Sequence, residues 1–394
     1  MKMRLNRYLR LNLKGEYILI KDGLIYDFFA HPMRIFFIFA GILGILGASI
    51  LGFRIGDFVG LHQFIFLELF CAAAFCGFLF TAVPDWTGFK KSLIPYSIIG
   101  FTLLILALVS KFAGFDGRIF VAIFWLFLAL SVLFWLIIGK NYDNFALVFL
   151  LFTTALIEIL PLFNGANLLN FHALLHCYTA GIILIGFRVS ITLGRQALNR
   201  KFGDKSAEYI FIPNPILKNI SLLFMIILSY ASLLGLDPLT QGFIAFGAGL
   251  VLLSGVAQWH HRELLSVHYT VIYYVLILGS GILYSFFGLN LLFGAGYGLQ
   301  ILHGITIWTL LGFVFFIFNV SSLRHSGQII LNLPICGKMG LGFLFIAAIS
   351  RLFLTEYSAF YITVPAIFVG LVFLMFSGRY FIIYKNNPFT HDPR

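Results

Sequence analysis

Four histidines, His62, His172, His176 and His303, lie inside long apolar runs of the sequence, each near the start of its run. Ionisable residues in such runs are expensive to bury in a membrane and usually have a function. A neutral imidazole binds haem iron, copper or zinc. These residues therefore predict a metal-carrying integral membrane protein. Haem iron or copper is favoured over zinc, because both suit a redox setting in a membrane.

His172 and His176 are one helical turn apart. Residues with this spacing share a helix face, so both imidazoles can point at a single ion, as in helical zinc motifs. We therefore predict a metal site at this pair. For His62 and His303 two interpretations stay open: a metal ligand, or a packing histidine bonded to a backbone carbonyl or to a Ser or Thr hydroxyl.

Two charged residues have distinct expected roles. Glu68 follows His62 by six residues and lies about 120° from it around an α-helix, so it faces another helix or a water path. We expect either a proton route or a hydrogen-bonded tie between helices. Arg188 lies roughly 24 Å along the helix from His172 at 1.5 Å per residue. This distance puts it at the opposite membrane edge, where we expect it to be an interfacial anchor.

The composition indicates the elements that position these residues. Hydrophobic residues make up 61% of the 394 and charged residues 10%, with a mean hydropathy of +1.00, whereas globular chains are about a quarter charged. Runs long enough for a helix to span the bilayer exclude the short alternating strands of a barrel. The sequence predicts an all-α polytopic membrane protein with about twelve transmembrane helices: 33–53, 58–83, 92–113, 118–139, 142–162, 168–190, 214–236, 240–259, 267–288, 294–320, 337–354 and 358–384.

Residues 33–384 thus form one transmembrane helical domain, between a basic N-terminal segment (1–32) and a short tail (385–394). All but four of the 26 Lys and Arg residues fall on the side that holds both termini. Because basic residues favour the cytoplasmic side, we expect both flanking segments to be cytoplasmic. The net charge of +11 reflects this sidedness and predicts no nucleic-acid partner. The four exceptions are Arg54, Lys111, Arg118 and Arg351.

The histidines lie on spans 2, 6 and 10, which run inward from the outer face under this orientation. All four are then expected in the outer half of the membrane. The spacing suggests three four-helix units with equivalent helices facing a centre. The segments that start at His172 and His303 share a leading His and a hydroxyl-rich end with Gln, whereas span 2 shares only the His.

Four sequence blocks resemble the NnrS family, bacterial membrane proteins associated with denitrification and nitric oxide tolerance and described as carrying haem and copper. These are HPMRIFF (31–37), GFLFTAVPDWTG (77–88), the His172 helix that ends in Arg188, and SLRHSGQ (322–328). The resemblance implies the bacterial inner membrane, haem and copper as cofactors, and nitric oxide or another diatomic gas as ligand. It leaves open whether the protein is a nitric oxide-related redox enzyme or a binding or protective protein. Family members read His-x-His-Glu where this chain has only His62 followed by Gln63, Phe64 and Ile65.

A looser, topological likeness is to the core subunit of haem-copper oxidases and nitric oxide reductases. There, helices 2 and 10 hold a six-coordinate haem and helix 6 offers a copper ligand. The likeness implies His62 and His303 as axial ligands of one haem, b-type because the chain has no Cys-x-x-Cys-His motif. The chain lacks the His-His pair on helix 7 and the His-x-His on helix 10, so the likeness does not extend to an oxygen-reducing binuclear centre.

Three hypotheses follow from the sequence. The first is a haem- and copper-binding inner-membrane protein of nitric oxide metabolism or nitrosative stress protection. The second is a secondary transporter of a small solute, for which twelve spans and repeated units are also typical. The third is an assembly factor for a reductase complex. The sequence indicates the lipid bilayer as a partner and points to no electron donor.

Overall fold

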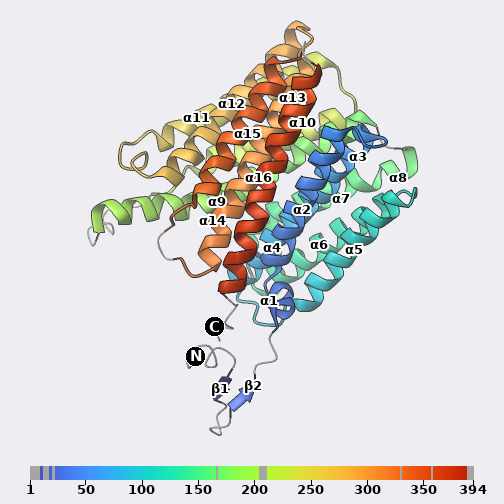
Figure 1. The fold of residues 1–394 in the computed structure, drawn as a ribbon. Coiled ribbons are helices and arrows are strands. Elements are labelled where there is room, and N and C mark those ends of the chain that lie inside the picture. Colours follow the sequence, from blue (N-terminus) through green and yellow to red (C-terminus); the bar gives the residue numbers. More distant parts are fainter. Residues whose placement is uncertain are drawn as a thin grey trace.

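Helices make up nearly all of the transmembrane part of the chain. The computed structural model describes residues 9–11, 17–19, 23–165, 167–203, 211–328, 331–355 and 358–387. Twelve stretches of helix within these ranges are long and apolar enough to cross a membrane, which confirms the predicted all-α polytopic fold (Figure 1). The helices are α1 (Leu24–Ala30), α2 (Pro32–Phe53), α3 (Phe58–Gln63), η2 (Phe64–Phe70), α4 (Cys71–Thr87), α5 (Ile94–Phe112), α6 (Arg118–Ile138), η3 (Tyr142–Asn144), α7 (Phe145–Ile159), α8 (Pro161–Asn164), α9 (Leu168–Phe202), α10 (Pro215–Leu233), α11 (Pro238–Val256), η5 (Ala257–Trp259), α12 (His268–Phe293), α13 (Gly298–Gly304), η6 (Ile305–Leu311), α14 (Gly312–His325), α15 (Ile335–Phe353) and α16 (Ser358–Asn386).

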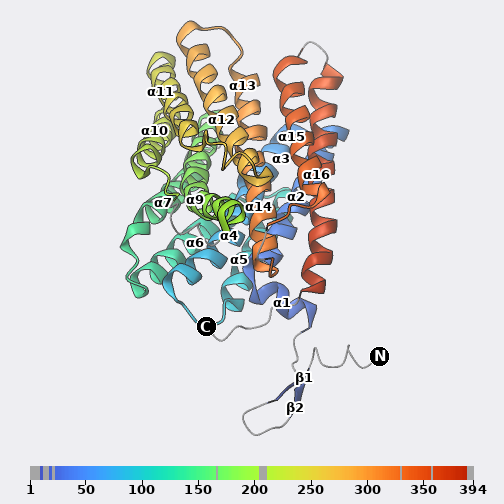
Figure 2. The ribbon, with the colours of Figure 1, turned by 90° about the vertical axis from the view of Figure 1, so that its left-hand side faces the viewer.

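The three spans that carry the predicted histidines lie at the centre of the bundle. These are α3–η2–α4, α9 and α13–η6–α14, the second, sixth and tenth spans. Their most apolar windows are 89%, 67% and 83% buried inside the protein, more than in any other candidate span. α9 contacts both η2 and η6, and α14 contacts α2. The other spans surround this centre, with α15 and α16 on one flank and α10, α11 and α12 on another (Figure 2).

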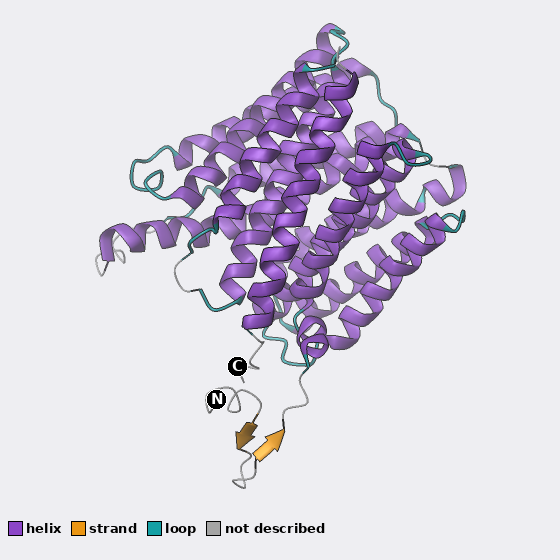
Figure 3. Cartoon of the chain, viewed as in Figure 1, coloured by secondary structure: helices purple, strands orange, loops and turns teal. Residues whose placement is uncertain are grey.

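The first and last long helices lie side by side, with the start of α2 next to the end of α16 (Figure 1). Arg34 in the first turn of α2 donates hydrogen bonds to the backbone carbonyls of Tyr384 (3.4 Å) and Asn387 (2.7 Å). The short helix α1 lies at this end of the bundle, which we call the α1 side. Beyond it, β1 (Leu9–Leu11) and β2 (Tyr17–Leu19) form an antiparallel hairpin (Figure 3).

Two of the helix ends predicted from the sequence are wrong. Span 2 is predicted to end at residue 83, before Pro84, but α4 continues through this proline to Thr87. The next residue, Gly88, has a φ of 65°, the left-handed conformation common after a helix. The Thr87 hydroxyl donates to the carbonyls of Val83 and Pro84, which supports this last turn. α9 runs to Phe202 rather than to residue 190, because no helix-breaking residue follows the apolar part.

Candidate functional site

Two of the histidines occupy matching positions relative to an unusual helix geometry. His62 lies in α3 two residues before the π-helix η2, and His303 lies in α13 two residues before the π-helix η6. Each π-helix is seven residues long and joins two α-helical parts of one span. π-helical segments inside α-helices occur frequently at functional sites. The matching geometry of spans 2 and 10 therefore makes His62 and His303 candidate functional residues.

His62, His172 and His303 line one cavity of about 400 Å³ at the side of the bundle opposite to α1. Small-molecule and cofactor sites generally occupy roughly 300–1,000 Å³ and are mostly apolar with a few polar groups. Here the polar groups are the three imidazoles, Gln63, Thr306 and Arg351. The apolar wall comes from the ends of α2, α3, η2, α9, α13, η6 and α16 and includes Leu51, Phe58, Phe66, Leu168, Phe171, Leu175, Leu299, Leu302, Leu311, Tyr361, Pro365 and Val369.

The His62 ring has a nitrogen available in this buried setting. Its Nδ1 atom is buried and has no hydrogen-bond partner, and the ring lies 5.0 Å from the Phe66 ring, centroid to centroid. Buried polar atoms are nearly always hydrogen-bonded, so an unpartnered one calls for an explanation such as a bound group. The donor chemistry of His62 fits a metal ligand.

The His303 ring is held on both sides. Its Nδ1 lies 2.8 Å from the Leu299 carbonyl and its Nε2 lies 2.9 Å from Nη2 of Arg351. An Nδ1–H bond to a backbone carbonyl is the contact that orients most histidine ligands and leaves the Nε2 lone pair for a metal. In this structure that lone pair accepts from Arg351. In the sequence, Arg351 stands alone at the end of an apolar span, and this isolated charge is the signal that could have pointed to the site.

His176 does not line the cavity. It is fully buried between α9 and α12, where its Nδ1 lies 3.1 Å from the Tyr284 hydroxyl, which donates in turn to the Thr179 hydroxyl at 3.0 Å. Its Nε2 is buried without a partner. The structure thus places His172 at the cavity and His176 one turn deeper, in the bundle interior.

Glu68 pairs with Arg118 at the start of α6, with Nε 3.0 Å from Oε1. Its Oε2 is buried without a partner. A second buried carboxyl, Glu158 of α7, accepts from the Tyr178 hydroxyl at 3.2 Å. Glu68 thus contacts α6 through Arg118, and its role as a proton route or a helix tie stays a prediction.

Arg188 lies near the α1 side of α9, about 24 Å from the His172 end of that helix. Its guanidinium is 4.5 Å from the centroid of the Trp86 ring and donates to Asn144 Oδ1. Tryptophan is common at the level of lipid headgroups. The role of Arg188 as an interfacial anchor stays a prediction.

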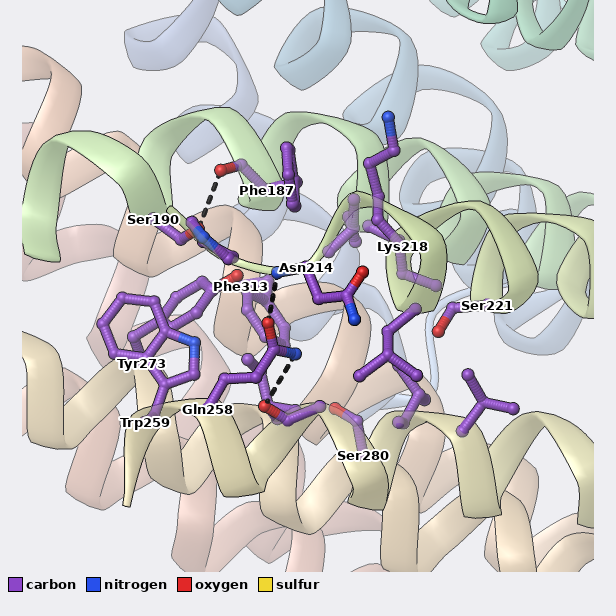
Figure 4. A pocket seen from close by; sticks show the side chains of 18 of the residues that line it. Phe187, Ser190, Asn214, Lys218, Ser221, Gln258, Trp259, Tyr273, Ser280 and Phe313 are labelled. Carbon is purple, nitrogen blue, oxygen red and sulfur yellow. Dashed lines mark hydrogen bonds between the residues drawn. The ribbon is translucent and has the colours of Figure 1, made fainter. Parts of the chain in front are cut away.

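A second, smaller pocket of about 80 Å³ lies between α9, α10, α11 and α12 and contains none of the predicted site residues. Figure 4 shows Lys218 beside Phe187, with Nζ 4.9 Å from the ring centroid. Gln258 accepts a hydrogen bond from the backbone N–H of Asn214. The pocket also reaches Thr179, which accepts a hydrogen bond from the Tyr284 hydroxyl.

No group of three or more His, Cys, Asp or Glu side chains in the described ranges is arranged to hold a metal ion. A haem needs no such group, because its iron takes at most two axial ligands from the protein. The cavity volume, the apolar wall, the three imidazoles and the unpartnered Nδ1 of His62 fit a haem.

Fold and cavity together define a polytopic membrane protein with a histidine-lined interior cavity. The family model described as NnrS protein matches residues 27–386, so the chain belongs to the NnrS family. This membership supports a role related to nitric oxide. No curated protein and no solved structure matches the chain.

Proposed function

We propose that this protein binds haem and copper in the bacterial inner membrane and serves nitric oxide metabolism or protection against nitrosative stress. One observation carries the proposal: imidazoles from three spans far apart in sequence meet at one large apolar cavity. The haem would lie in this cavity and bind or process a diatomic gas. An uncharged gas can enter through apolar walls, which admit no ion.

His62 and His303 are the proposed axial ligands. Leu299 holds the His303 ring in the orientation that a ligand needs, and His62 offers its Nδ1. Bound haem would supply an iron that could take nitric oxide in place of one of the two imidazoles. The axial imidazoles and the apolar wall would tune its reduction potential.

His172 and His176 are the proposed copper site. The imidazoles come from consecutive turns of α9, and Tyr284 fixes the His176 ring while leaving its Nε2 without a partner. Imidazole suits copper well. Glu68 is the proposed proton-route residue or helix tie, and Arg188 the proposed interfacial anchor.

We further propose that the α1 side faces the cytoplasm, because most Lys and Arg residues lie there. The cavity is then near the periplasmic surface. This orientation also places residues 1–32 and 385–394 in the cytoplasm and leaves 33–384 as the transmembrane domain.

The test is an absorption spectrum and metal analysis of the purified protein. We expect a Soret band that shifts when nitric oxide is added, and copper in the sample. His62→Ala and His303→Ala should each lose or broaden the Soret band, whereas His260→Ala, in an exposed loop, should keep it. An unchanged band in both cavity variants would exclude this axial pair. Protein that holds no haem and moves a solute across vesicles would instead favour the transporter.

A further inference from the structure

Arg351 brings a positive charge to the cavity, and no acidic side chain in the described part of the chain forms an ion pair with it. It lies in the last turn of α15 with 7% of its surface exposed. Among the residues that the structure describes, no acidic one lines the cavity, and the ion pairs found there both belong to Arg118. Arg351 instead donates to the Tyr361 carbonyl at 2.7 Å, lies over the Tyr361 ring at 3.9 Å and donates to Nε2 of His303 at 2.9 Å.

These neutral partners satisfy some of the guanidinium N–H groups, and no described residue compensates the charge itself. A buried charge is stable only when it is paired or well solvated. A guanidinium has five donors in a planar fork that matches the two oxygens of a carboxylate. The cavity therefore has the charge, the donor geometry and the space for a ligand that carries a carboxylate.

We propose that Arg351 anchors a carboxylate side chain of the tetrapyrrole that the cavity takes, and that this contact uncovers His303. A carboxylate that draws the guanidinium toward itself competes with His303 Nε2 for the hydrogen bond from Arg351. Once Arg351 turns to the carboxylate, the Nε2 lone pair is free, while the bond from Nδ1 to Leu299 keeps the ring in place. The inference rests on the proposed function, and it assigns Arg351 as a positioning residue.

A pair of probes that differ only in charge tests the proposal: haemin, and haemin dimethyl ester, in which both carboxylates are blocked. The protein is produced without haem and placed in lipid nanodiscs. We expect the wild type to bind haemin roughly tenfold or more tightly than the ester, a ratio in the range of a charge-assisted hydrogen bond to a carboxylate. In Arg351→Met the two affinities should agree within about twofold.

The ligation state gives a second readout that a purely structural role would not change. In the wild type the ester should leave Arg351 on His303 and give a high-spin spectrum. In Arg351→Met the same ester should give a six-coordinate, low-spin spectrum, because nothing covers Nε2. Arg351→Lys keeps the charge without the fork and should give an intermediate preference for haemin. Arg54→Gln, an exposed arginine on the same side, should behave like the wild type.

Equal binding of haemin and ester by the wild type would overturn the role of Arg351 and leave the haem proposal intact. If neither tetrapyrrole binds the wild type, the proposed function fails and this inference fails with it. Size-exclusion profiles of Arg351→Met and Arg351→Lys show whether each variant is folded. If Arg351→Met does not fold, the haemin preference of Arg351→Lys still tests the proposal.

Discussion

At the level of single residues, the buried contact between Glu68 and Arg118 joins η2 to α6. The Glu68 side chain is 1% exposed and that of Arg118 15%. A buried ion pair contributes little net stability compared with apolar residues, but removing one partner leaves a buried charge alone. The contact therefore ties the central span that carries His62 to the outer layer of the bundle.

We predict that Arg118→Met lowers the free energy of unfolding by about 3–5 kcal/mol, because Glu68 stays buried without its partner. The double variant Glu68→Gln/Arg118→Met should recover most of this loss. Unfolding in mixed detergent micelles, followed by circular dichroism, measures both. A double variant as unstable as the single one would show that the carboxylate is not what destabilises Arg118→Met.

The sequence predicted that the histidines lie toward one end of the bundle, but it did not predict their hydrogen-bond partners. Spacing and charge bias were enough to place His62, His172 and His303 toward one end of the bundle. Neither could show that the His176 ring would bond to Tyr284, because that contact depends on how α9 and α12 are rotated against each other. The contact of Arg351 with His303 joins residues 48 positions apart, and no local pattern encodes it.

At the level of elements, close helix packing depends on glycine. α11 and α12 pack closely, with Gly242 and Gly249 on one helix facing Gly288 and Gly281 on the other. A Cβ at Gly288 would lie 2.7 Å from the Gly242 carbonyl oxygen and would also clash with the Phe246 backbone nitrogen. Small residues let membrane helices approach until their backbones touch.

Gly288→Ala should therefore destabilise the protein by roughly 1–3 kcal/mol, the range for overpacking, because the obstacle is backbone that cannot move aside. Gly378→Ala is the matched control: this helical glycine of α16 has nothing within 4 Å of an added Cβ. There the gain in helix propensity should leave stability unchanged or raise it by up to about 1 kcal/mol. Thermal unfolding of both variants in one detergent compares them, and a neutral Gly288→Ala would contradict the packing.

The number and positions of the spans could be read from hydropathy, but the π-helices could not. An apolar run looks the same whether its backbone bonds are α or π. The 120° angle between His62 and Glu68 assumed an α-helix, whereas Glu68 lies within the π-helix η2. The sequence left open whether Glu68 faces another helix or a water path, and in the structure it contacts Arg118 of α6. The likeness of spans 2 and 10, which was weak in the sequence, is clearer in the backbone.

At the level of the whole molecule, the two membrane faces differ in charge and in chemistry. The histidine cavity opens among helix ends opposite to α1, and most basic residues lie on the α1 side. We predict that Phe115→Cys, in the loop between α5 and α6, reacts with a membrane-impermeant maleimide in intact cells. His260→Cys, in the loop before α12, should react only after the cells are broken.

Both variants are made in a Cys336→Ala background, because Cys336 is half-buried whereas Cys71, Cys76 and Cys177 are fully buried. Phe115 and His260 are both exposed, so a difference between them reports sidedness rather than access. The opposite labelling pattern would invert the orientation and put the cavity on the cytoplasmic side.

α9 is 35 residues long, or about 52 Å at 1.5 Å per residue, against a hydrocarbon layer of about 30 Å. The single helix α9 thus joins the cavity wall at His172 to a basic stretch with Arg195, Arg200 and Lys201. This basic end of α9 extends past the bundle on the α1 side (Figure 1). Phosphates of the adjacent leaflet attract those cations and resist vertical sliding of the helix. The depth of the imidazoles below one surface of the bilayer is in this way fixed by lipid contacts at the other.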